Sequence, residues 1–181
     1  MKTMKSIALA CVALAACCFA SCGNSNKVND KAAQELNAQI DAMNEQGAKV
    51  AQENAQKGKQ YIEQQLKADP ELKQTKSGLV YKITVPGSGA TFAETDKVTL
   101  HYTGKHIDGS TFDSSVDRGE PATFPVNAVV PGFKEMLMMM RPGAKAHCII
   151  PGNLGYGDQG NEVIGPNEVL VFDIETIALA K

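Results

Sequence analysis

The sequence lacks an excess of charge of either sign. Its 181 residues carry 18 Lys and Arg against 20 Asp and Glu, a net charge of −2, and contain no run of basic residues. A nucleic-acid-binding surface needs a concentration of positive charge that this chain does not have. Cysteine is also scarce, because four of the five cysteines fall within the first 22 residues. The rest of the chain, with Cys148 alone, cannot form a disulfide framework and must rely on a hydrophobic core.

The residue combinations of ordinary enzyme active sites are missing as well. His101, His106 and His147 have neither a suitably spaced partner histidine nor a cysteine pair, so no metal site is expected. No G-x-S-x-G motif presents a nucleophilic serine, and no glycine-rich loop precedes a helix as in phosphate-binding sites. No cofactor is expected either. Any chemistry must therefore do without the usual reactive groups.

The first 21 residues resemble an export signal. Lys2 and Lys5 are followed by an uncharged apolar stretch over residues 7–20, which is shorter than the roughly 20 residues needed to span a bilayer. The stretch ends at Ser21-Cys22-Gly23, which resembles the lipobox of bacterial lipoproteins and implies lipid attachment at Cys22. Leu14-Ala15-Ala16-Cys17 is a second match, so Cys17 is the alternative. An ordinary cleaved signal with incidental cysteines is the remaining interpretation.

Residues 22–75 form a polar segment with a thin apolar stripe. Its apolar residues recur mostly at spacings of three and four, and include Val28, Leu36, Ile40, Met43, Val50, Ile62 and Leu66. This pattern predicts a long helix that Gly47 or Gly58 breaks or bends and that Asp69-Pro70 ends. So thin a stripe cannot fold alone. The helix must lie against a partner, pair with an identical helix, or serve as a stalk.

Residues 76–181 have the pattern of a separate β-rich domain. Short apolar runs alternate with turn signals such as Pro86-Gly87-Ser88-Gly89 and Asp108-Gly109. Strands are predicted at 79–85, 97–106, 111–113, 122–126, 145–150 and 169–178, and one helix at 131–140, beginning at Pro131. Cys148 falls within a predicted strand, where it should be a buried, inert thiol. The expected fold is α+β, a mainly antiparallel sheet with one short helix on its face.

Several motif-like blocks occur in order over residues 76–181, which is far more specific than a single motif. The blocks are Val98-Thr99-Leu100-His101-Tyr102-Thr103-Gly104, Asp108-Gly109-Ser110-Thr111-Phe112-Asp113-Ser114-Ser115, Arg118-Gly119, Val130-Pro131-Gly132-Phe133, Leu154-Gly155-Tyr156-Gly157, Ile164-Gly165-Pro166-Asn167 and Leu170-Val171-Phe172-Asp173. Together they resemble the FKBP family of peptidyl-prolyl cis/trans isomerases. Lys76-Ser77-Gly78-Leu79-Val80-Tyr81 and the helical segment before it resemble the lead-in of the family's bacterial lipoprotein and periplasmic members. The resemblance implies an antiparallel sheet wrapped over a short helix with a hydrophobic pocket between them. It also implies isomerisation of Xaa-Pro bonds in exported proteins, or, as the alternative, a chaperone that binds proline-containing segments with little turnover.

The resemblance also implies which residues form the pocket. Phe133 corresponds to the pocket floor, and Asp113 to a carboxylate held by Arg118 near the Tyr102 hydroxyl. The backbone N–H of Val130 and the hydroxyl of Tyr156 correspond to donors for substrate carbonyls. The residues implied in catalysis are Tyr102, Phe112, Asp113, Phe133, Tyr156 and Phe172, and those implied in substrate binding are Arg118, Phe124, Val129, Val130 and Ile164.

Three departures from the family pattern affect the expected partners. The floor is Phe133 where many members have tryptophan, Ala122 stands where many have an aromatic wall residue, and the segment 160–163 is about one residue shorter. We therefore expect weak binding of tacrolimus-type macrolides. The expected partners are proline-containing polypeptides, the membrane through the lipid anchor, and a second copy through residues 28–68. The expected location is the bacterial cell envelope, facing the periplasm from the outer membrane.

Overall fold

The computed structural model describes residues 25–180. The expected signal over residues 1–21 and the candidate lipidation sites Cys17 and Cys22 lie outside the described residues. Within residues 25–180, no helix combines the length and the apolar character needed to cross a membrane.

The first element is one long helix, α1 (Ser25–Ala68). It ends where the sequence predicts, because Asp69-Pro70 cannot continue a helix, and Asp69 Oδ1 accepts a hydrogen bond of 2.9 Å from the Glu71 N–H just beyond. The expected break at Gly47 or Gly58 is wrong, since both glycines lie within the uninterrupted helix. Gly58 instead allows the helix backbone to approach Val169. Residues 41–181 form one compact unit, so the last part of α1 belongs with the domain that follows.

The domain is built on a single antiparallel sheet. Its strands are β1 (Lys73–Gln74), β2 (Val80–Pro86), β3 (Lys97–Lys105), β4 (Thr111–Ser114), β5 (Ala122–Pro125), β6 (Ala144–Ile150) and β7 (Leu170–Leu179). The strand order is β1-β2-β6-β7-β3-β4, and β5 pairs with β3 beside this path. Every pairing is antiparallel. The predicted fold class is confirmed.

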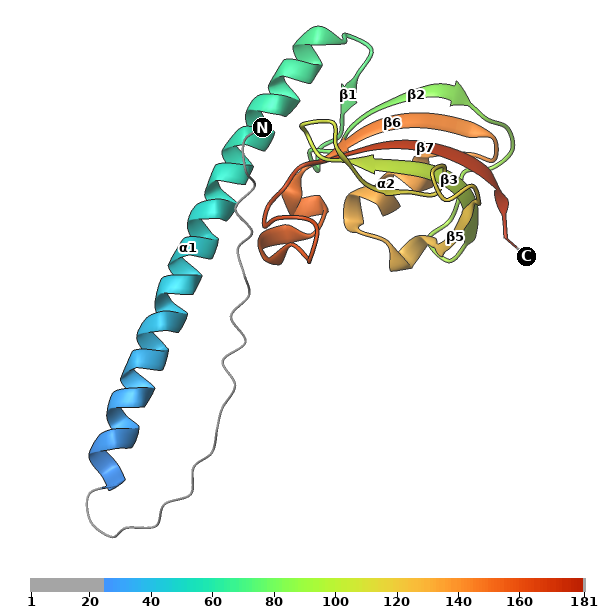
Figure 1. Cartoon of the computed structure of the whole chain (residues 1–181). Coiled ribbons are helices and arrows are strands. Elements are labelled where there is room, and N and C mark those ends of the chain that lie inside the picture. The colour runs from blue at the N-terminus through green and yellow to red at the C-terminus, as the bar shows by residue number, and fades with distance from the viewer. Residues whose placement is uncertain (1–24, 181) are drawn as a thin grey trace, which may run out of the picture. The chain divides into compact units, whose positions relative to one another are not determined.

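One short helix, α2 (Pro131–Met139), packs beneath the arched strands (Figure 1). Pro131 occupies its first turn, where a missing N–H costs nothing. Three 3-10 turns, at Val126–Ala128, Gly152–Leu154 and Gly157–Gln159, connect the main elements. The sequence did not predict these turns or β1, because elements of two or three residues carry no periodicity.

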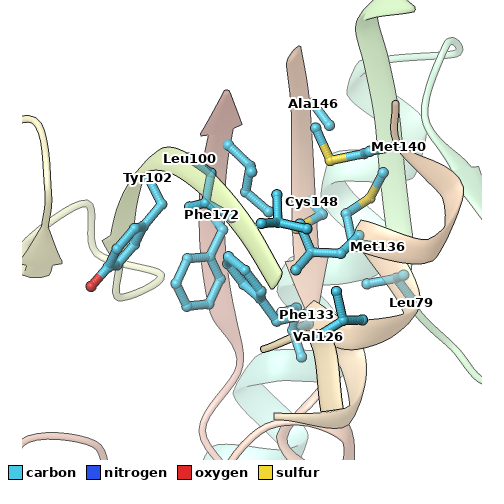
Figure 2. Packing of buried hydrophobic residues seen from close by; sticks show 14 of the residues in the cluster. Leu79, Leu100, Tyr102, Val126, Phe133, Met136, Met140, Ala146, Cys148 and Phe172 are labelled. Atoms are coloured by element: carbon cyan, nitrogen blue, oxygen red, sulfur yellow. The ribbon is translucent and has the colours of Figure 1, made fainter. Parts of the chain in front are cut away.

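The main core lies between α2 and the facing side of the sheet. Phe133, Met136 and Met140 project from α2 and its end towards Cys148 of β6 and Phe172 of β7 (Figure 2). Residues of β3 alternate between buried and partly exposed, as expected for a strand with one face on a core. Cys148 is fully buried, as predicted, and burial raises the pKa of its thiol far above the usual value, which favours an inert role.

A smaller core lies on the opposite side of the sheet. Val80, Ile149 and Val171 point away from α2 and pack with Leu72 and Val169. Three side chains of α1, Tyr61, Ile62 and Leu66, cover this cluster. The apolar stripe of α1 therefore has a partner at its C-terminal end, which explains how so polar a helix is held in place there.

Candidate functional site

A cavity of about 290 Å³ opens between α2 and the sheet. Its lining is predominantly apolar and comes from strands, the segment that leads into α2, the first turn of α2 and the loop after β6. The lining residues are Tyr102, Phe112, Asp113, Phe124, Ala128, Val129, Val130, Phe133, Tyr156 and Phe172. A concave apolar site with few polar groups is typical of a pocket that binds a small ligand or one side chain of a larger ligand.

Five aromatic rings form the body of this cavity. The Phe133 ring lies 5.1 Å from Phe172 and 6.2 Å from Tyr102, centroid to centroid, in edge-to-face arrangements. Phe112 packs edge-on against Phe172 at 5.6 Å, and Phe124 against Tyr102 at 5.7 Å. Such pairs are favourable because the positive ring edge meets the negative ring face. Figure 2 shows Phe133 and Phe172 side by side, with the Tyr102 hydroxyl directed away from the core.

Gly104 gives two of these rings their room. A Cβ atom at this position would lie 2.5 Å from Phe112 Cζ and 2.8 Å from Phe172 Cε1. Any side chain at position 104 would therefore displace the rings that line the cavity. A glycine inside a strand often marks such a close approach, so its position in the sequence is a signal that the site prediction did not use.

The polar side of the cavity is one hydrogen-bonded cluster. The Tyr102 hydroxyl donates to Asp113 Oδ2, and Arg118 Nη1 donates to Asp113 Oδ1. Arg118 Nη2 also donates to the Tyr102 oxygen at 3.1 Å, and the guanidinium lies over the Tyr102 ring at 5.7 Å. Ser115 fixes the strand beneath, since its Oγ accepts a 2.9 Å bond from the Tyr102 N–H. The cluster holds the orientation of the phenol that forms one cavity wall.

The same contacts set the charges of the cluster. Burial raises the pKa of Tyr102, and the hydrogen bond to Asp113 raises it further, so the phenol stays protonated. Burial also acts to raise the pKa of Asp113, but hydrogen bonds from Tyr102 and Arg118 outweigh it and leave that pKa below its usual value. At neutral pH the cavity thus presents a neutral phenol beside an ionised, fully paired carboxylate.

The structure brings nearly all the site residues expected from the sequence to this one cavity. Arg118 stands beside it through Asp113 and Tyr102, whereas Ile164 is buried in the adjoining core and does not line it. Ala128 lines the cavity but was not among the expected residues. A small apolar residue in a short turn gives no sequence signal of its own.

Comparison with known proteins agrees with this geometry. Residues 89–177 match the model of the FKBP-type peptidyl-prolyl cis-trans isomerase family. Residues 6–83 match the domain found amino-terminal to FKBP-type peptidyl-prolyl isomerases. The crystal structure of FkpA from Escherichia coli superimposes with a TM-score of 0.76 at 34% identity, over 86% of this chain and 73% of that one.

Two relatives are similar over most of the sequence. An FkpA from Aeromonas hydrophila is 44% identical over 164 residues, 88% of this chain, and an FKBP-type 22 kDa isomerase from Escherichia coli K12 is 43% identical over 150 residues, 82% of this chain. The chain spans 61% of the length of the first relative and 71% of the second. By sequence and by fold, the chain belongs to the family of FKBP-type peptidyl-prolyl cis-trans isomerases.

Proposed function

We propose that this protein is a peptidyl-prolyl cis-trans isomerase that acts on Xaa-Pro bonds of exported polypeptides and assists their folding. The observation that carries the proposal is the aromatic cavity itself. Its rings enclose a volume of about 290 Å³, suited to a proline ring, and its polar groups lie to one side. The cavity contains no strong nucleophile, and isomerisation requires none because no bond is broken.

The physical barrier explains why such a cavity can catalyse. Rotation about a peptide C–N bond costs roughly 18–20 kcal/mol because amide resonance is lost. An Xaa-Pro bond interconverts unaided in tens to hundreds of seconds. The twisted amide has less charge separation than the planar one, so an apolar site disfavours it less than water does. Preferential binding of the twisted form lowers the barrier.

Each group of the cavity has a proposed part in this step. Phe133, Phe172 and Tyr102 hold the proline ring between α2 and the sheet. The Val130 N–H and the Tyr156 hydroxyl bind the carbonyl oxygens on either side of the bond that turns. Phe112 and Asp113, braced by Arg118, close the remaining wall. Phe124 and Val129 line the substrate side, and Ile164 supports them from the core.

The test is an assay of cis-to-trans conversion in Leu-Pro and Phe-Pro peptides. Acceleration by the wild-type protein, lost in Phe172→Ala and reduced in Tyr156→Ala, would support the proposal and locate the site. A folded protein that leaves the uncatalysed rate unchanged would sink it. In that case binding of the same peptides without turnover would identify the second candidate, a chaperone that captures proline-containing segments.

One observation favours that second candidate as an additional role. α1 exposes four large apolar side chains, Leu36, Ile40, Met43 and Val50. Exposed apolar residues on an otherwise polar helix offer contacts to unfolded chains or to a second copy of the protein.

We propose that, in the absence of an unfolded chain, the protein is a homodimer that associates through residues 28–68.

The N-terminal residues support a location at the cell envelope. Their charged start, apolar stretch and Ser21-Cys22-Gly23 ending favour export and lipid attachment at Cys22, with Cys17 as the alternative. We propose that the isomerase domain then faces the periplasm from the outer membrane. Metabolic labelling with a radioactive fatty acid tests the lipid attachment, because Cys22→Ala should abolish labelling and Cys17→Ala should not.

The cavity walls also bear on inhibitor binding. Phe124 packs against Tyr102 and supplies an aromatic wall from β5, while Ala122 of the same strand leaves space. With Phe133 in place of a larger ring, we propose that tacrolimus-type macrolides bind weakly. Calorimetric titration measures this directly.

A further inference from the structure

Helix α1 reaches the loop that follows the cavity. Asn54 lies in the part of α1 that belongs to the compact unit of residues 41–181. Its side-chain amide Nδ2 donates a 2.9 Å hydrogen bond to the carbonyl oxygen of Pro166, which is 112 positions further along the chain. The close approach of Gly58 to Val169, one turn along the helix, makes this contact geometrically possible. The amide also lies 3.0 Å from where a Cβ of Gly165 would stand, so the helix and loop are tightly packed.

The loop that contains Pro166 is hydrogen-bonded to the segment that carries the cavity residue Tyr156. Asn167 follows Pro166, and its N–H donates a 2.7 Å hydrogen bond to the carbonyl oxygen of Gly157. Gly157 in turn follows Tyr156, which lines the cavity and is 40% exposed. The helix is therefore linked to Tyr156 through one side-chain hydrogen bond, one backbone hydrogen bond and the peptide bonds between neighbouring residues.

Two hydrogen bonds stabilise the loop conformation. Asn167 has a φ of 52°, in the left-handed region that asparagine adopts more readily than most other residues with a side chain. Contacts with the surroundings add to this local preference. The Asn54 bond to the preceding carbonyl is one support, and the bond from Asn167 Nδ2 to Asp158 is another.

A second connection runs towards Phe112, another residue that lines the cavity. Glu168 Oε2 accepts a 2.7 Å bond from the Gly165 N–H, while its Oε1 pairs with His106. The His106 ring packs edge-on against Phe112 at 5.2 Å between centroids. The loop that Asn54 holds is thus bonded to neighbours of two cavity residues, Tyr156 and Phe112.

We propose that Asn54 is a positioning residue that holds Tyr156 at the cavity through Pro166, Asn167 and Gly157, so that α1 takes part in shaping the site. This inference rests on the proposed isomerase function, and in particular on the Tyr156 hydroxyl as a donor to the substrate. It assigns to the helix a role in the reaction besides those of stalk or dimerisation element.

A double-mutant cycle in the full chain tests the proposal. Asn54→Ala should lower kcat/KM by about two- to tenfold, the range of a single uncharged hydrogen bond, with most of the change in KM. In a Tyr156→Phe background the same substitution should have a clearly smaller effect, because the group it positions is gone. Gln52→Ala is the matched control, since Gln52 is an exposed amide two positions away on the same helix. Asn54→Asp keeps the side-chain size but replaces the donor with an acceptor facing the Pro166 carbonyl, so it should reproduce the loss even if Asn54→Ala folds poorly.

The outcomes separate this inference from the proposed function. Equal kcat/KM in Asn54→Asp and wild type, or an undiminished loss in the Tyr156→Phe background, would overturn the inference while leaving the isomerase intact. If the wild-type chain shows no isomerase activity, the amide NMR signals of Tyr156 and Gly157 decide the structural claim without turnover. Signals that move in Asn54→Asp but not in Gln52→Ala support the link, and signals that stay in place in both overturn it.

Discussion

At the scale of single residues, the cavity contains two kinds of aromatic side chain. Phe133 is 5% exposed and belongs to the core, whereas Tyr156 is 40% exposed and belongs to the rim. Substitutions at these two positions should therefore differ in their effects, since only the change at Phe133 should lower the stability of the fold. Phe133→Ala should cost about 3–5 kcal/mol of unfolding free energy, as is usual for a buried ring, together with most of the activity.

Tyr156→Phe should behave in the opposite way. The ring and its contacts are kept, so the unfolding free energy should change by less than about 0.5 kcal/mol. Loss of a hydroxyl that binds a substrate carbonyl should lower kcat/KM by about three- to tenfold. Urea unfolding and the peptide assay, run on the same two variants, measure both effects. Parallel losses of stability and activity in Tyr156→Phe would contradict the proposed role.

The pH dependence also belongs to this scale. Asp113 has a pKa below its usual 3.8 and Tyr102 one above its usual 10, so neither group titrates near neutrality. The value of kcat/KM should be flat between about pH 6 and pH 8. Because the folded-state pKa of Asp113 is depressed, its stabilising contribution is present above the unfolded-state pKa and is lost as pH falls through the folded one. A rate that changes steeply between pH 6 and pH 8 would instead require a histidine in the mechanism.

At the scale of elements, the two glycines of α1 have different surroundings. A Cβ at Gly47 would meet nothing within 4 Å, whereas a Cβ at Gly58 would overlap Val169 Cγ2. Gly47→Ala should stabilise the helix by about 0.5–1 kcal/mol. Gly58→Ala gains the same propensity but must displace either Val169 or the helix, so it should destabilise the domain. Thermal unfolding followed by circular dichroism compares them, and stabilisation by both substitutions would show that α1 does not pack closely on Val169.

The elements also show how far the sequence could lead. α2 and the strands β2 to β7 were predictable because their periods and turn residues are local properties of the chain. Local reasoning failed at Gly58, where the cost of a glycine in a helix is offset by a contact with Val169, more than 100 positions away. The cavity residues were found through a family resemblance, because aromatic residues scattered over 70 positions show no spacing that brings them together. Glu168 and Asn54, which hold the loop, gave no sequence signal at all.

At the scale of the whole molecule, the exposed apolar residues of α1 predict association. Met43 is 72% exposed and Ile40 46%. If residues 28–68 form a dimer interface, the wild-type chain should sediment as a dimer and Met43→Glu should shift it towards monomer. Lys49→Glu, a charge change at a polar position of the same helix, serves as the control. A wild-type monomer at micromolar concentration would end the dimer proposal.

The position of β7 in the sheet determines when the domain can fold relative to its synthesis. β7 is synthesised after the other six strands of this sheet, yet it lies in the middle, between β6 and β3, and β2 likewise pairs with the later strand β6. Until residues 170–179 are released, no strand ladder joins β1, β2 and β6 to β3, β4 and β5, so we expect the domain to stay unfolded until then. Deletion of residues 170–180 should accordingly leave the domain without a cooperative unfolding transition. A domain that stays unfolded until β7 is synthesised is compatible with the export proposed above, because an unfolded chain can still be translocated.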